Sequence, residues 1–156
     1  MAVLVGVDPG ATTGVCIVEE CSAQADDFQV VSALQIPWEE RLSFFQALFS
    51  GTSVYAINEP RLPEVVVIEQ FKLRGDAAFH QVGSDFPSVR IIGIIEAMVF
   101  VYKEVVGNSP LLVYQPNADI HRVQILPQHE AKFVGLKHAA DAYRHLRYYM
   151  LTTHKG

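Results

Sequence analysis

A short apolar run that ends in an acidic residue and a proline sets the strongest constraint on the fold of this chain. Residues 3–7 are apolar and are followed directly by Asp8, Pro9 and Gly10. Because a proline forces the residue before it into extended geometry, Asp8 is expected to close a β-strand. Residues 15–18 are apolar again, which predicts an antiparallel hairpin. The sequence therefore places one carboxylate at the end of a buried strand.

The rest of the chain shows alternating strand and helix patterns. A third strand is expected over residues 28–36, and Pro37 suits the first turn of a helix over residues 38–49. Residues 65–68 are β-branched throughout, as in a strand buried on both faces, and lead into Glu69. The remaining expected elements are a helix over residues 87–106, a short strand over residues 111–114 and a last helix from about 134 to 151. This order is typical of a mixed α/β fold.

Length and composition favour one compact domain over residues 1–156. A chain of 156 residues that is half hydrophobic can bury one substantial core. The apolar stretch near residues 89–106 is interrupted by charged residues, so no membrane-spanning helix is expected. The start of the chain lacks the features of a signal peptide, and Cys16 and Cys21 do not have metal-type spacing. The expected location is the cytoplasm.

The net charge of −5 argues at first against a nucleic-acid partner, since phosphate binding usually requires a basic surface. The charge is unevenly distributed, however. Residues 1–71 hold ten acidic and two basic side chains, whereas residues 72–156 hold seven acidic and ten basic ones. The second half can therefore carry a basic face, although an ordinary solvated surface accounts for the same counts equally well.

Four potential metal ligands stand at element boundaries or on one helix face. Asp8 and Glu69 each end an apolar strand, and if those strands are neighbours the two carboxylates meet at one edge of the sheet. His138 and Asp141 are three residues apart in the last helix and therefore share a face. Taken singly, each residue is better explained as a solvated or structural side chain. Together they form an oxygen-rich site with one nitrogen, which suits Mg²⁺ or Mn²⁺ better than Zn²⁺.

Such a ligand set is suited to the hydrolysis of phosphodiester bonds. Two cations about 3.5–4 Å apart can position a water opposite the leaving oxygen and neutralise the charge that builds on the phosphate. Carboxylates hold the cations by charge. His138 can bind one cation or help to deprotonate the attacking water. Chemistry of this kind requires no cysteine or serine nucleophile.

Three motifs resemble those of the RuvC-type Holliday-junction resolvases, which are ribonuclease H-like nucleases. They are Val-Gly-Val-Asp-Pro-Gly at residues 5–10 with Thr13 and Gly14 soon after, Val-Ile-Glu-Gln at residues 67–70, and Lys-His-Ala-Ala-Asp-Ala at residues 137–142. Their order and separations also match, so the resemblance spans nearly the whole chain. The first loop is one residue shorter than in the bacterial resolvases, and residues 116–135 match their pre-catalytic helix poorly. The short loop and Tyr-Arg-His at residues 143–145 look more like the bacteriophage versions.

The resemblance implies a fold, a metal site and an activity. The fold would be a ribonuclease H-like mixed five-stranded sheet flanked by helices. Asp8, Glu69, His138 and Asp141 would bind two divalent ions, Mg²⁺ or in its place Mn²⁺. The protein would cut four-way junctions and other branched DNA with paired symmetric nicks, as a homodimer. A two-fold dimer suits a two-fold substrate because it offers two equivalent sites, and the apolar helix 88–106 is the candidate interface.

Five candidate DNA-binding side chains flank the acidic residues in sequence: Phe71, Lys72, Arg74, Lys132 and Lys137. The four basic ones could hold DNA phosphates near the site, or they could belong to a scattered basic surface. Related resolvases use an aromatic side chain near the junction branch point at the position of Phe71. This ring could stack on an unpaired base or simply anchor its loop.

Three other functions share some of these features. Asp-Pro-Gly followed by Thr-Thr-Gly also resembles the phosphate loop of sugar kinases and actin-like proteins, but those proteins bind nucleotide between two domains, and this chain has residues for one. A branched-DNA binding protein without cutting activity would lack one of the acids, all of which are present here. A ribonuclease H-like nuclease that acts on RNA would share the metal site and differ in its substrate groove.

Overall fold

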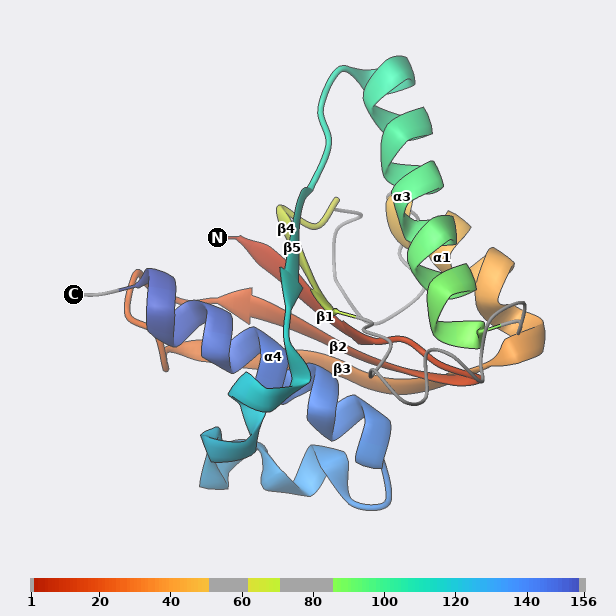
Figure 1. The fold of residues 1–156 in the computed structure, drawn as a ribbon. Coiled ribbons are helices and arrows are strands. Elements are labelled where there is room, and N and C mark those ends of the chain that lie inside the picture. Colours follow the sequence, from red (N-terminus) through yellow and green to blue (C-terminus); the bar gives the residue numbers. More distant parts are fainter. Residues whose placement is uncertain (1, 51–61, 71–85, 155–156) are drawn as a thin grey trace.

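The computed structural model describes residues 2–50, 62–70 and 86–154, and these residues form one five-stranded mixed sheet. The order of the strands is β3-β2-β1-β4-β5 (Figure 1). β1 pairs antiparallel with β2, which pairs antiparallel with β3, whereas β4 runs parallel to β1 and β5 parallel to β4. The strands are β1 (Val3–Asp8), β2 (Thr12–Glu20), β3 (Phe28–Pro37), β4 (Val65–Glu69) and β5 (Leu111–Gln115). The predicted ribonuclease H-like mixed sheet is confirmed.

Helices cover both faces of this sheet. α1 (Arg41–Phe49) and α3 (Pro87–Val106) lie on one face, and α4 (Lys137–Thr153) lies on the other with the 3-10 segments η2 (Asn117–Arg122) and η3 (Pro127–Phe133) beside it (Figure 1). The last helix starts at Lys137, later than predicted, because η3 ends at Phe133 and Gly135 has a φ of 73° that a right-handed helix does not accommodate.

The predicted helix over residues 38–49 is divided in two. Its first turn is the 3-10 segment η1 (Trp38–Glu40), and α1 follows from Arg41. The guanidinium carbon of Arg41 lies 3.9 Å from the centre of the Trp38 ring, and its Nη1 donates to the Trp38 carbonyl at 2.8 Å. These two contacts stabilise the turn at which the chain leaves β3.

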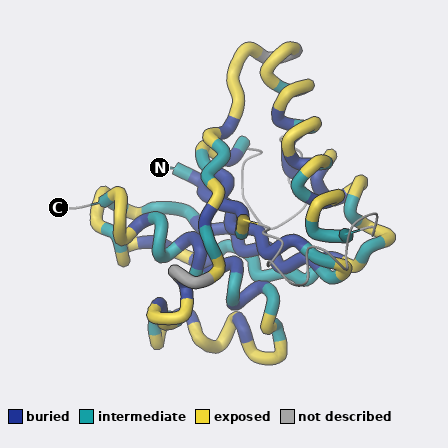
Figure 2. Tube along the Cα trace, in the orientation of Figure 1, coloured by how far each residue is buried: buried dark blue, intermediate teal, exposed yellow. Residues whose placement is uncertain are grey.

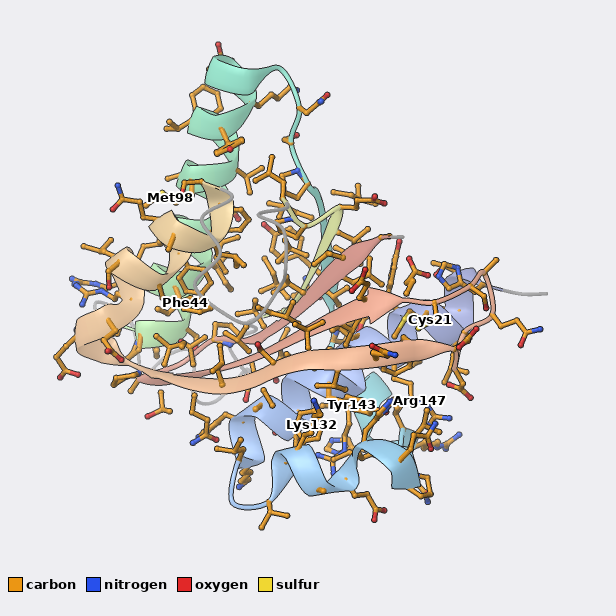
Figure 3. The ribbon with its side chains drawn as sticks, turned by 180° about the vertical axis from the view of Figure 1, so that it is seen from behind. Cys21, Phe44, Met98, Lys132, Tyr143 and Arg147 are labelled. Carbon is orange, nitrogen blue, oxygen red and sulfur yellow. The ribbon has the colours of Figure 1, made fainter. Side chains whose placement is uncertain are left out.

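The sheet separates two apolar cores. Alternate residues of β1 point to opposite faces, so Val3, Val5 and Val7 pack with α1 and α3 while Leu4 packs with α4. Figure 2 shows the buried residues concentrated along the strands. Seen from behind in Figure 3, Phe44 lies on the α1–α3 face and Tyr143 on the α4 face. Each such side chain that is fully buried contributes roughly 1.5–3 kcal/mol to folding.

Two glycines allow α4 to lie directly on the strands. A Cβ atom at Gly6 would come within 2.3 Å of the Ala142 carbonyl oxygen. A Cβ atom at Gly14 would come within 2.0 Å of the His138 carbonyl oxygen. No larger residue fits at either position unless the helix moves away. The glycines of the first sequence motif therefore set the distance between the sheet and the helix that carries His138.

A β-bulge in β3 decides which of its side chains face α4. Val18 pairs with Val30 while Ile17 pairs with Ser32, so Val31 is an extra residue on β3. The extra residue changes the alternation of side chains along the strand. As a result Gln35 lies on the α4 face, the same face as Val30.

α3 is only partly buried within the described part of the chain. Its exposed apolar residues are Val89, Phe100 and Val101, at 48%, 64% and 55% exposure. A Cβ atom at Gly93 would have no neighbour within 4 Å. Gly93 is therefore not covered by another element within the part of the chain that the structure describes. In that same part, no helix has both the length and the apolarity to cross a bilayer.

Candidate active site

Two carboxyl groups meet at one edge of the sheet. Val7 of β1 pairs with Ile68 of the parallel strand β4, so the next residues, Asp8 and Glu69, lie side by side at the ends of adjacent strands. A hydrogen bond joins their carboxyl groups. Asp8 is only 8% exposed. The convergence predicted from the two apolar strands is therefore present.

Burial makes both carboxyl groups harder to ionise. It is the largest cause that raises the pKa of Glu69 from its usual 4.5 to about 8, and the hydrogen bond and negative charge of Asp8 add to it. Burial also raises the pKa of Asp8, against which the hydrogen bond from Glu69 acts. A hydrogen bond between two carboxyl groups requires one proton, and the raised pKa of both acids favours keeping it. Asp8, Glu69 and the nearby Asp141 therefore concentrate negative charge at one place.

α4 brings His138 to the same place. Its Nδ1 lies 3.1 Å from Asp8 Oδ2, so that the ring N–H donates to the carboxylate. Its backbone N–H donates to Gln35 Oε1 at 3.0 Å, which ties the start of the helix to β3. Because Gly14 pairs with Asp8 across the hairpin, the close approach at Gly14 sets this distance. The His138 side chain remains 44% exposed and can be reached from solvent.

Asp141 faces the site from the same helix but is held by a cation. Its negative charge raises the pKa of Asp8 and of Glu69 after the larger effect of burial, so it lies within electrostatic reach of both. Arg144 Nη1 donates to Asp141 Oδ1 at 2.8 Å. The Arg144 guanidinium thus partly neutralises the Asp141 carboxylate. The shared proton does the same for the carboxyl groups of Asp8 and Glu69.

Two buried polar residues that sequence reasoning missed support Glu69. Gln115 ends β5 and pairs in register with Glu69. Its Oε1 accepts from His145 Nδ1 at 3.1 Å, and both side chains are buried. A positive charge on His145 lowers the pKa of Glu69, against the stronger effect of burial. Two signals could have found them, because Gln115 ends a strand as Glu69 does and His145 follows Asp141 by one helical turn.

The loop after Asp8 is closed by its own residues and by α3. Thr13 Oγ1 donates to the Gly10 carbonyl at 3.2 Å, and the Thr13 side chain is buried. Ser88 Oγ donates to the Pro9 carbonyl at 2.8 Å. These bonds fix the turn of the first motif and connect it to the start of α3.

The candidate DNA-binding residues have different surroundings. Phe71, Lys72 and Arg74 lie outside the described residues. Lys137 is exposed, and its charge is close enough to lower the pKa of Asp8, although burial has the larger and opposite effect. Lys132 Nζ donates to the Val30 carbonyl at 2.8 Å. Of the two predicted DNA-binding lysines that the structure describes, Lys137 thus acts on Asp8 and Lys132 is held by β3.

The donor groups suit a hard divalent cation in kind. Carboxylate oxygens with one imidazole are ligands that Mg²⁺ and Mn²⁺ accept, and a cation could replace the proton shared by Asp8 and Glu69. As they are oriented, no three His, Cys, Asp or Glu side chains in residues 2–50, 62–70 and 86–154 form a group that could hold a metal ion. Asp141 would have to exchange Arg144 for the ion. The donor set therefore fits a divalent cation in its chemistry, and Asp141 can join it only after this ion pair opens.

The architecture and the position of the acids define the class of fold as ribonuclease H-like. No protein-family model and no curated protein matches the chain. Among solved structures it is similar to "T. thermophilus RuvC in complex with Holliday junction substrate", with a TM-score of 0.54 and 17% identity over 99% of this chain and 96% of that one. It is also similar to "Thermus thermophilus RuvC structure", with a TM-score of 0.53 and 19% identity over 96% and 95% of the two chains. The chain therefore has the RuvC-type fold over nearly its whole length, as its motifs indicated.

Proposed function

We propose that this protein is a metal-dependent endonuclease that resolves four-way DNA junctions. The observation that carries the proposal is the meeting of Asp8 and Glu69 at one sheet edge with His138 on the helix above them. The resemblance of three motifs and of the whole fold to RuvC supports the same conclusion. A solved structure of that protein contains a Holliday junction, which supports branched DNA as the substrate.

Asp8, Glu69, Asp141 and His138 would hold two Mg²⁺ or Mn²⁺ ions. When bound, such ions supply charge neutralisation at the phosphate and an activated water. Glu69 must lose its proton for this, and its raised pKa means that ion binding and proton release occur together. The exposed ring of His138, oriented by Asp8, can bind an ion or take the proton of the attacking water.

We further propose a homodimer in which α3 forms the interface. The exposed apolar side chains Val89, Phe100 and Val101 would be covered by the second copy. A hollow of about 370 Å³ beside Gly93 and Ala97, with Arg41 and Arg90 at its border, lies on the same helix. Paired nicks need two equivalent sites, which a two-fold dimer provides.

The test is cleavage of a labelled four-way junction and of a matched linear duplex in Mg²⁺, in Mn²⁺ and in EDTA. We expect cutting of the junction alone, at symmetric positions, and only with a metal. An RNA–DNA hybrid of the same sequence is the third substrate. Equal cutting of the duplex, or preferential cutting of the hybrid, would refute the junction-resolving function.

A further inference from the structure

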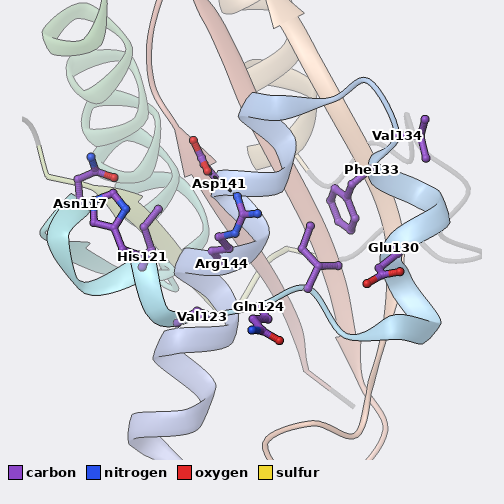
Figure 4. A pocket seen from close by; sticks show the side chains of 11 residues that line it. Asn117, His121, Val123, Gln124, Glu130, Phe133, Val134, Asp141 and Arg144 are labelled. Atoms are coloured by element: carbon purple, nitrogen blue, oxygen red, sulfur yellow. Dashed lines mark hydrogen bonds and ion pairs between the residues drawn. The ribbon is translucent and has the colours of Figure 1, made fainter.

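A pocket of about 580 Å³ lies beside α4, between this helix, η2 and η3. Figure 4 shows Asn117 and His121 on one side, Asp141 and Arg144 on the helix, and Phe133 and Glu130 on the side of η3. Its volume is in the range of pockets that bind small organic groups. Among the candidate residues that the structure describes, Asp141 alone lines it, so the pocket extends the site into a region without an assigned role.

The pocket is continuous with the candidate active site. Asp141 lines it and also acts electrostatically on Asp8 and Glu69. Arg144 lies at the same border, and its side chain is 33% exposed. A guanidinium has five N–H donors, more than the single hydrogen bond to Asp141 uses. Arg144 can therefore also contact a phosphate that lies next to the one being cut.

The lining combines apolar surface with amide groups. The exposed Val134 and the half-buried Ile125 supply apolar surface over the buried side chain of Phe133. Asn117 and Gln124 are exposed, and their amides both donate and accept hydrogen bonds. A nucleobase has an apolar face and a polar edge with donors and acceptors. Bases outside a duplex bind proteins by stacking on such surfaces and by hydrogen bonds at their edges.

We infer that this pocket binds an unpaired nucleobase of the DNA strand that is cut, beside the scissile phosphate. The inference rests on the proposed nuclease function. A base held here would keep its strand beside Asp141 while Arg144 neutralises the neighbouring phosphate. The preference for branched over linear DNA then follows in part, because strands at a branch point can release a base from the stack at a lower cost than a continuous duplex.

The experiment measures the fluorescence of 2-aminopurine placed at successive positions on either side of the cleaved bond in a four-way junction. The junction is bound to wild-type protein in EDTA, so that no cutting interferes. We expect a fluorescence change at one position on binding. The double variant Asn117→Ala with Gln124→Ala should lose this change, because it removes both amides, while Gln128→Ala, an exposed change on η3 outside the pocket, should keep it.

Cleavage of the unlabelled junction in Mg²⁺ is the second measurement. The double variant should cut roughly tenfold more slowly, as expected for the loss of two hydrogen bonds. Val134→Trp, which fills the pocket from a residue that is 81% exposed, should also cut more slowly and still fold. A thermal melt of each variant checks that the fold is retained.

Failure of the pocket and failure of the nuclease function are distinguishable. If wild-type protein cuts the junction but no position responds, or if the double variant responds and cuts as wild type does, the base pocket is refuted. If wild-type protein does not cut in Mg²⁺, the proposed function is refuted. The fluorescence response still decides the pocket in that case, and a protein that binds no junction refutes both.

Discussion

Adding one methyl group at Gly14 should move α4 away from the sheet and separate His138 from Asp8. The Cβ atom of Gly14→Ala would lie 2.0 Å from the His138 carbonyl oxygen, whereas ordinary contact begins at 3.4 Å, so the helix or the strand must shift by about 1.4 Å. His138 Nδ1 is now 3.1 Å from Asp8 Oδ2. A shift of this size breaks that contact, because a hydrogen bond is lost beyond about 3.5 Å.

Both activity and stability should fall. A displacement of about 1 Å in a catalytic group can cost about a hundredfold in rate, so junction cleavage by Gly14→Ala should decrease by roughly that factor. Forcing a methyl group into a packed contact costs about 1–3 kcal/mol. For a chain of this length such a loss lowers the melting temperature by roughly 2–12 °C.

The assay compares single-turnover cleavage of a labelled junction with thermal melting of the same preparation. Gln29→Ala, at an exposed position of β3, is the control for an alanine placed in the sheet and should behave as wild type. DNA affinity should change little, because Gly14 has no basic side chain that could bind a DNA phosphate. If Gly14→Ala cuts and melts as wild type does, α4 does not depend on this close approach, and the account of how the site is assembled is wrong.

Four further predictions concern the metal site, the DNA and the dimer. Asp8→Asn should abolish junction cutting while DNA binding is kept or improved, because the change removes the negative charge of a proposed metal ligand and leaves the basic side chains that contact DNA. Cleavage at the wild-type rate in Mg²⁺ would show that Asp8 is not a metal ligand. Lys137→Ala should weaken junction binding and lower its salt dependence, measured by titration at several salt concentrations, while cutting at saturating protein is kept. The raised pKa of Glu69, about 8, means that the folded state binds a proton more tightly than the unfolded state. The contribution of Glu69 to the melting temperature without metal should therefore be greatest below pH 4.5 and should fall as pH rises towards 8. Mg²⁺ should raise the melting temperature more at pH 8 than at pH 5. Glu69→Gln should remove this difference between the two pH values. Phe100→Glu should shift the protein from dimer to monomer in light scattering, because it places a charge in the proposed apolar interface; a wild-type monomer, also with junction bound, would exclude this interface.

The positions of the strand-end acids could be predicted because local rules determine them. Pro9 forces Asp8 into extended geometry, and the β-branched run before Glu69 has no good alternative to a strand. Helical spacing likewise placed His138 and Asp141 on one face. Each of these predictions needs only neighbours in sequence. The structure confirms the expected adjacency of the two strands, whereas their parallel direction was not predicted.

Other parts of the site depend on contacts that no local pattern reveals. Gln35 faces α4 because of the extra residue Val31 in β3, and nothing in the sequence marks that bulge. The ion pair of Arg144 with Asp141 has visible helical spacing, but a cation that neutralises a metal ligand is not distinguishable in sequence from an ordinary surface pair. Lys132 donates to a backbone carbonyl of β3, a long-range contact that sequence proximity to His138 does not suggest.

The contact between His138 and Asp8 joins residues that are 130 positions apart in the chain. At a synthesis rate of about 5–20 residues per second, the ribosome makes Asp8 roughly 6–26 s before His138. A nascent chain can pair β1 with β2 and bring Asp8 towards Glu69, but it has no His138 or Asp141 until its last helix is made. If the chain is the nuclease proposed above, translation products that end before α4 would carry part of the acidic cluster without the residues needed to cut DNA.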